Sequence, residues 1–240
     1  MELDPFSIMN GIFSLLFVSI SVLVGIIIIF KYFEYKNRIL LWVGLTWIGI
    51  SSPWWPSSVS IVKILVTNQG LSLEVFLFLG NFFVPFAPIF WMFAFSELHY
   101  KEKQKTLVGV YGIISIVYEI VFLYFLFTDP LVIGQPAGDI DVSTSLFVTI
   151  YQIFLLLSLL ITGIIFSQQS MKSKNREIRL KGKLLLIAFL SFVGGAILDV
   201  FSSGSILILI FSRIILISAA LEFYSGFMLP NWVKSLFIQQ

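Results

Sequence analysis

The chain has 240 residues, of which 58% are hydrophobic and only 12% are charged, and it contains no cysteine. A composition this apolar excludes a soluble globular protein, and the lack of thiols excludes disulfides and thiolate metal sites. The net charge of +2 says little by itself, whereas its distribution along the chain is informative. We expect the lipid bilayer to be a partner and expect no nucleic-acid partner.

Hydropathy divides the sequence into seven apolar segments, several of them longer than the roughly 18 residues that predict a membrane-spanning helix. They are residues 6–32, 39–64, 71–97, 106–128, 144–169, 184–203 and 205–228. The opening MELDPF has two acids and no base, unlike a secretory signal peptide, so we expect the first segment to remain in place. The sequence therefore predicts an all-α membrane protein, with residues 1–240 forming a single seven-transmembrane-helix domain.

The second segment contains ISSPWWPSSVS, residues 50–60, which interrupts an otherwise apolar run. If the helix ends near Ser52, the two tryptophans form an interface belt and the following residues lie on the membrane surface. If the helix continues to residue 64, the prolines kink it inside the bundle and open its backbone toward a cavity. We favour the kink.

The connections between segments alternate in charge. KYFEYKNR, HYKEKQK and MKSKNREIRLKGK are rich in Lys and Arg, whereas the opposite connections carry acids and almost no base. The longest of these, DPLVIGQPAGDIDVS at 129–143, is rich in Pro, Gly and Asp and is predicted to be a loop. The positive-inside rule then places the N-terminus outside a plasma membrane and the C-terminus in the cytoplasm.

Polar side chains inside apolar segments are costly, so each one is a hypothesis for a functional site. Counted along each helix at about 1.5 Å per residue, several of them fall in one layer of the outer half, level with the PWWP break. The predicted ligand-binding residues are Trp54, Trp55, Asn81, Glu119, Gln152, Asp199 and Arg213. Polar groups also tie membrane helices together without binding anything, and Asp199 with Arg213 could be such a structural pair. Both interpretations stay open.

No catalytic residue, metal site or cofactor is predicted. His99 is the only histidine and lies in a cytoplasmic connection, which removes haem ligation, histidine metal clusters and a Ser–His hydrolase from consideration. The last apolar segment has no lysine for covalent retinal. An enzyme acting on lipids or isoprenoids lacks a paired-acid motif here.

The stretch EFYSGFMLPNWVKSLF ends the last segment at Pro230 and places Trp232 near the interface. In this exit and in its overall layout, the chain resembles the seven-helix sensor modules at the N-terminus of prokaryotic histidine kinases. Together with the outward-facing polar layer, the resemblance favours a non-catalytic sensor or receptor-like protein with an outward-facing pocket for an unknown small ligand. Its signalling partner would bind at the basic loop 171–183, although the six bases of this loop can also serve membrane topology and bind anionic lipid head groups. The alternative is a small-solute or ion transporter, which needs a polar path through the inner half, where Glu97 and Glu222 lie.

Overall fold

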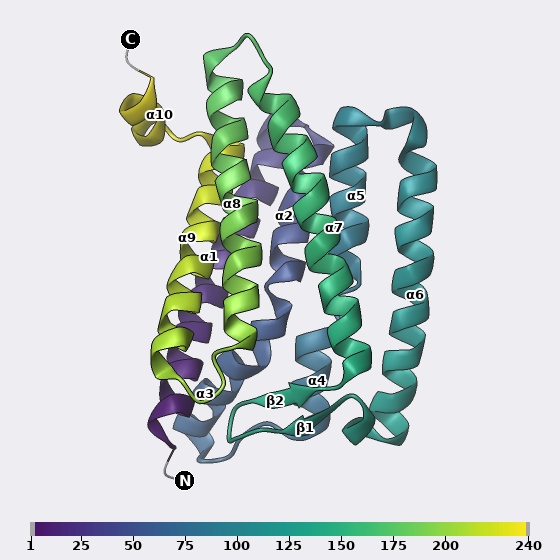
Figure 1. Cartoon of the computed structure of the whole chain (residues 1–240), viewed down its shortest axis with the longest axis vertical. Coiled ribbons are helices and arrows are strands. Elements are labelled where there is room, and N and C mark those ends of the chain that lie inside the picture. Colours follow the sequence, from purple (N-terminus) through teal and green to yellow (C-terminus); the bar gives the residue numbers. More distant parts are fainter. Residues whose placement is uncertain (1–2, 239–240) are drawn as a thin grey trace.

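A computed structural model describes residues 3–238 and shows a bundle of long helices with one short hairpin at its end (Figure 1). The prediction of a mostly helical protein is confirmed. The helices are α1 Pro5–Tyr35, α2 Arg38–Ile50, α3 Trp55–Thr67, α4 Leu73–Asn81, α5 Phe86–His99, α6 Gln104–Thr128, α7 Leu146–Met171, α8 Arg176–Val200, α9 Ile206–Met228 and α10 Asn231–Phe237. Short 3-10 turns η1, η2 and η3 span Ser52–Trp54, Lys101–Lys103 and Pro130–Val132, and strands β1 and β2 span Gly134–Pro136 and Val142–Thr144.

Within the described residues, six helical stretches are long and apolar enough to cross a membrane. One of them, Leu73–His99, consists of α4 and α5 joined by a turn at residues 82–85. The predicted segment 39–64 is not among the six, because it is divided into α2 and α3 by η1. Both halves pack against α1, so the chain bends inside the bundle at this point and α3 is not a separate surface helix.

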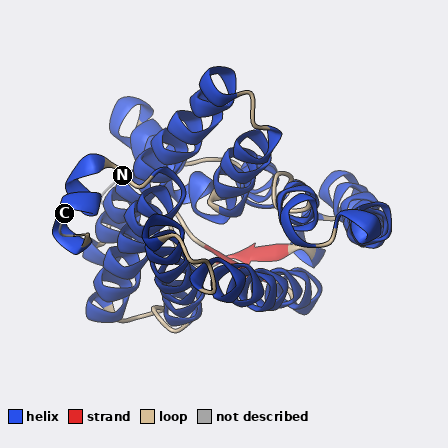
Figure 2. Cartoon of the chain, turned by 90° about the horizontal axis from the view of Figure 1, so that it is seen from above, coloured by secondary structure: helices blue, strands red, loops and turns tan. Residues whose placement is uncertain are grey.

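Neighbouring helices form a closed ring around the bundle axis (Figure 2). α1 packs on α2 and α9, α2 packs on α5, α5 on α7, α7 on α8, and α8 on α9. α6 lies outside this ring against α5 and α4, at one edge of the molecule in Figure 1. A ring of six packed elements leaves space at its centre, and side chains fill that space in one half only.

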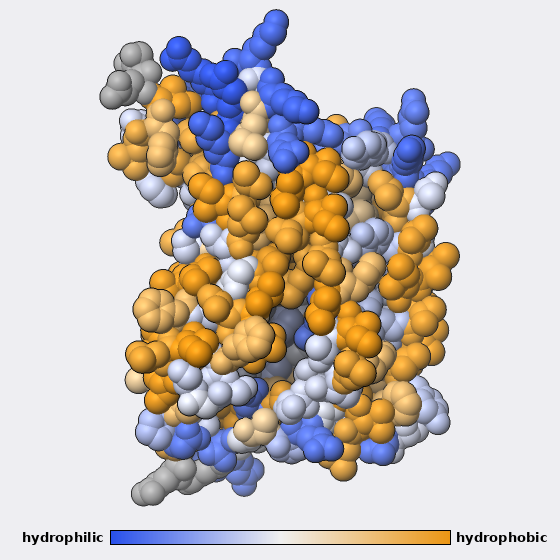
Figure 3. All heavy atoms as spheres, in the orientation of Figure 1, coloured by the Kyte–Doolittle hydropathy of each residue, from blue (hydrophilic) through white to orange (hydrophobic). Residues whose placement is uncertain are grey.

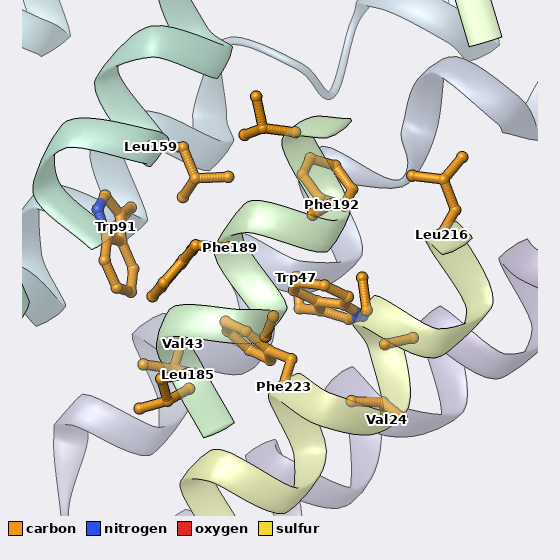
Figure 4. Packing of buried hydrophobic residues seen from close by; sticks show 14 of the residues in the cluster. Val24, Val43, Trp47, Trp91, Leu159, Leu185, Phe189, Phe192, Leu216 and Phe223 are labelled. Carbon is orange, nitrogen blue, oxygen red and sulfur yellow. The ribbon is translucent and has the colours of Figure 1, made fainter. Parts of the chain in front are cut away.

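The filled half holds a cluster of large aromatic side chains (Figure 4). Trp47 stacks on Phe223 with ring centroids 4.0 Å apart, and Trp91 meets Phe189 edge to face at 5.2 Å. Glycine allows α7 and α8 to approach closely here, because a Cβ on Gly163 would lie 2.5 Å from the Phe189 ring. Apolar side chains thus fill the centre of this half of the bundle.

The two ends of the bundle differ in charge. Of the 15 Lys and Arg residues, 13 lie in or beside the connections at the end that also carries α10, and only Lys63 and Arg213 lie elsewhere (Figure 1). Figure 3 shows a broad apolar belt between this strongly polar end and the opposite one. The start of α1 and α10 lie at opposite ends of the bundle (Figure 1).

Two connections differ from the prediction. The predicted loop 129–143 contains the antiparallel hairpin β1–β2, with Gly134 paired to Thr144 and Pro136 to Val142, so residue 144 is in a strand and α7 begins at Leu146. The basic stretch 171–183 is helical from Arg176, because Asn175 caps α8 by accepting from the Glu177 N–H at 2.8 Å. The change from basic to apolar residues near residue 184 is therefore not the start of a helix. The solvated bases between 176 and 183 belong to α8 and extend it beyond the apolar belt.

Candidate functional site

A cavity of about 440 Å³ occupies the half of the bundle that carries the hairpin. Its walls come from α1, α2, η1, α3, α5, α7, α8 and α9, with the β1–β2 connection across its end. The side chains toward the bundle middle are apolar and include Trp91, Leu159 and Phe192, which belong to the aromatic cluster. The opposite wall is polar. The cavity therefore has the size and the mixed lining of a small-molecule site.

The polar wall is organised by one ion pair. Arg213 on α9 donates from Nη1 to Oδ2 of Asp199 on α8 at 2.9 Å, and from Nη2 to Oδ1 of Asn10 on α1 at 2.8 Å. The Ser212 hydroxyl donates to the other Asp199 oxygen at 3.0 Å. The Arg213 side chain is only 4% exposed and that of Asp199 is 17% exposed, so the carboxylate is the member that faces the cavity.

The PWWP break supplies a further donor to this ion pair. Trp54 in η1 donates from Nε1 to Asp199 Oδ2 at 2.8 Å, and the Arg213 guanidinium lies 5.7 Å from its ring centroid. Pro53 and Pro56 have no N–H to donate, so some backbone carbonyls near the break lack their usual donor. Serine hydroxyls donate to carbonyls there instead. Ser51 Oγ donates to the Ile48 carbonyl and Ser58 Oγ to the Trp54 carbonyl, each at 2.8 Å. The bend thus turns Trp54 inward.

Trp55 points elsewhere. Its ring packs on Phe83 at 5.0 Å, its Nε1 donates to Ser51 Oγ at 3.1 Å, and it lines neither of the two cavities described for this half. Of the two adjacent tryptophans, Trp54 therefore lines the main cavity, and Trp55 braces α3 against the turn between α4 and α5.

The β1–β2 connection closes the end of the cavity. Ile133 and Ile140 are fully buried, and the Ile140 carbonyl accepts a hydrogen bond from Ser57 Oγ of α3 at 3.0 Å. Asp141 lies beside this anchor and lines the cavity, and its Oδ1 accepts the Val142 N–H at 2.8 Å. Burial raises the pKa of Asp141, and nearby Asp199 raises it further while Arg213 opposes the shift.

The remaining predicted residues are divided among three places. Gln152 lines both the main cavity and a smaller one of about 70 Å³, and Asn81 lines only the smaller one. Glu119 lies on α6 outside both cavities, and its carboxylate oxygens have no hydrogen-bond partner within residues 3–238. The structure thus brings Trp54, Gln152, Asp199 and Arg213 together around one space.

Sequence reasoning missed three polar residues of this wall. Asn10 was hidden in the first apolar segment, where it is 3% exposed and sits 2.8 Å from Arg213. Ser57 and Asp141 were read as part of the break and of a loop. Arg213 gave a signal that could have predicted Asn10. An arginine in an apolar segment with one acid as partner has further N–H donors, and these require other acceptors nearby.

No known protein family matches the chain, and neither a curated protein nor a solved structure is similar to it. In the described part of the chain, no group of three His, Asp or Glu side chains is placed to hold a metal ion. Function is therefore inferred from the geometry of the cavity.

Proposed function

We propose that the chain is a non-catalytic, receptor-like membrane protein that binds a small ligand in the cavity described above. The observation that carries the proposal is a cavity with a preorganised polar wall. At the middle of the bundle this cavity is bounded by the aromatic cluster. Asp199 is fixed by three donors, from Trp54, Ser212 and Arg213, so the wall keeps its shape without a ligand. Such preorganisation favours binding because little ordering remains to be done.

The proposal includes an orientation in the plasma membrane. The connections that carry 13 of the 15 bases would lie in the cytoplasm, following the positive-inside rule. The hairpin and the cavity would then lie in the outer half of the membrane, with the start of α1 outside. The cavity would report on the outer leaflet or the exterior of the cell.

The basic end would offer its surface to a signalling partner. α10 is joined to α8 there by an ion pair between Lys234 and Glu177, and Lys181 Nζ of α8 donates to the Phe227 carbonyl near the end of α9 at 3.0 Å. Trp232 is 62% exposed on the same short helix. A movement of α8 against α9 at the cavity would reach α10 directly, because both helices run through the whole bundle.

A transporter is the alternative function, and it requires an open path beyond the aromatic cluster. Trp47, Phe189 and Phe223 are at most 1% exposed and belong to the same packed cluster as Trp91 and Phe192 of the cavity lining (Figure 4). Glu222 Oε1 accepts the Ser218 hydroxyl at 2.7 Å, and Glu222 Oε2 is buried without a hydrogen-bond partner within residues 3–238. This packing favours binding without passage.

Native mass spectrometry of the protein purified from membranes tests the binding function. We expect the wild type to retain a small molecule and Arg213→Leu to lose it, while Lys234→Leu, far from the cavity, keeps it. A wild type and an Arg213→Leu variant with identical spectra, free of any adduct, would overturn the proposal. Flux through proteoliposomes that is abolished by Glu222→Leu would support transport instead.

A further inference from the structure

We propose that the cavity opens sideways between α7 and α8 into the bilayer and takes an amphiphile that has a positively charged head group and an apolar chain. This inference rests on the proposed binding function and names the chemical class of the ligand. The head group would lie at Asp141 and Asp199, and the chain would leave through the side of the bundle.

The lateral opening follows from the way α7 and α8 diverge. At the basic end they touch, because a Cβ on Gly163 would meet the Phe189 ring at 2.5 Å and one on Gly182 would meet the Ser167 carbonyl at 2.8 Å. Toward the hairpin, Gln152 of α7 and Val200 of α8 both line the cavity. Figure 3 shows a hollow at this place, between the two helices and within the apolar belt.

Two other sides of the cavity are covered by packed residues. The aromatic cluster seals the side toward the basic end, where Phe192 and Trp91 are at most 2% exposed. The hairpin covers the opposite end, held by Ile133 and Ile140, and the Ile140 side chain reaches within 3.0 Å of the Cβ position of Gly11 on α1. A ligand that passes between α7 and α8 need not displace either cover.

The edges of the opening are suited to lipid contact. Ile153 on α7 is 50% exposed, and Ile197 and Val200 on α8 are 49% and 71% exposed. Of these, only Val200 lines the cavity, so it marks the opening itself. Apolar side chains on both edges would let an acyl or alkyl chain extend from the cavity into the bilayer without a polar barrier.

The charge of the lining selects the head group. The charged residues that line the cavity are Asp141, Asp199 and Arg213, which gives one net negative charge when all three are ionised. Arg213 pairs with Asp199, whereas the Asp141 carboxylate has no Lys or Arg within 4.0 Å in the described part of the chain. An ammonium group on the ligand would neutralise it.

Chain length and head-group charge are the two variables that test this inference. The protein would be reconstituted in nanodiscs of phosphatidylglycerol, which has no amine, and its Tm measured with butylammonium and hexadecylammonium as probes. Hexadecanol, with the same chain and no charge, is the matched control at equal mole fraction in the bilayer. We expect both amines to raise the Tm and hexadecanol to leave it unchanged. Asp141→Asn should weaken hexadecylammonium binding about tenfold or more, the effect of losing one charged hydrogen bond.

Two positions on α8 test the opening. Val200→Trp should reduce the response to hexadecylammonium and preserve that to butylammonium, since only the long chain must leave the cavity. Leu190→Trp, at a residue that is 49% exposed on the same helix and does not line the cavity, should preserve both responses.

Butylammonium binding without hexadecylammonium binding would refute the lateral opening and leave the proposed function standing. Equal responses to hexadecanol and hexadecylammonium would refute the cationic head group. Absence of any response, together with no retained molecule in native mass spectra, would refute the binding function itself.

Discussion

Removing the Asp199 carboxylate should be one of the most destabilising single changes in the cavity wall. Asp199→Ala takes the acceptor from three donors at once, Trp54 Nε1, Ser212 Oγ and Arg213 Nη1. It also leaves Arg213, which is 4% exposed, with Asn10 as its only partner. Breaking a buried ion pair from one side costs about 3–5 kcal/mol. Because Asp199 itself is partly exposed to the cavity, we expect a loss of about 3 kcal/mol.

The opposite truncation should cost less. Arg213→Met leaves Asp199 with the Trp54 and Ser212 donors and with access to the cavity, so we expect about 1.5 kcal/mol, the value of one charged hydrogen bond. The double variant buries no unpaired charge and should lose about 2 kcal/mol. The two residues are therefore coupled by about 2.5 kcal/mol, within the range measured for contacting pairs.

Reversible unfolding in mixed micelles measures these free energies, with Ser158→Ala, on α7 and away from the ion pair, as the control for a change in the cavity lining. The decisive quantity is the difference between the double variant and the sum of the single ones. Additivity within about 0.5 kcal/mol would show that Asp199 and Arg213 do not act as a pair, and would refute the reasoning on the polar wall.

Three further predictions concern packing, an isolated acid and pH. Gly163→Ala should destabilise the protein by about 1–3 kcal/mol through overpacking against Phe189, whereas Gly112→Ala, with open space at its Cβ, should stabilise it by about 0.5–1 kcal/mol. Thermal unfolding of the two variants measures both effects, and equal effects would contradict the close approach of α7 and α8. Glu119→Leu should stabilise the protein by about 1–2 kcal/mol, because two buried oxygens without donors are removed, and should leave probe binding in the cavity unchanged; a weaker probe response would instead place Glu119 in the site. Burial raises the pKa of Asp141 above its unfolded value, and the charged groups facing it are Asp199 and Arg213. The folded state therefore holds the proton more tightly, and the contribution of Asp141 to stability falls as pH rises from the unfolded pKa to the folded one. A pH series of Tm should show this slope in the wild type relative to Asp141→Asn, and parallel curves for the two proteins would contradict it.

Hydropathy alone predicted the helices well because membrane helices must be long, apolar and internally hydrogen-bonded. It failed where local chemistry competes with length. The hairpin at 134–144 was read as loop because Gly134, Pro136 and Gly138 resemble loop residues, whereas the buried Ile133 and Ile140 fix it in place. Such anchoring depends on residues distant in sequence, which a single-chain pattern does not reveal.

The sequence predicted the level of the candidate site along the helices, but only in part which side chains face the cavity. Counting residues along each helix placed Glu119 and Trp55 at the level of Asp199, since rise per residue is fixed by helix geometry. Rotation about the axis decides which of them lines the cavity, and it depends on neighbour packing. α6 lies outside the ring, so Glu119 lies outside the site, and the bend at η1 selects Trp54 over Trp55.

The bends in two adjacent segments explain why the cavity exists where it does. The turn at η1 and the turn between α4 and α5 lie side by side, since a Cβ on Gly80 would meet the Pro56 ring at 3.0 Å. Two straight helices at these positions would place side chains along the bundle axis and fill its centre, as the aromatic cluster does in the other half of the bundle. Both segments are interrupted beside the cavity, because η1 separates α2 from α3 and residues 82–85 separate α4 from α5, and Pro53, Trp54 and Val84 of these breaks line the cavity. The prolines thus create the space, the serines satisfy the backbone around them, and Trp54 connects the bend to Asp199.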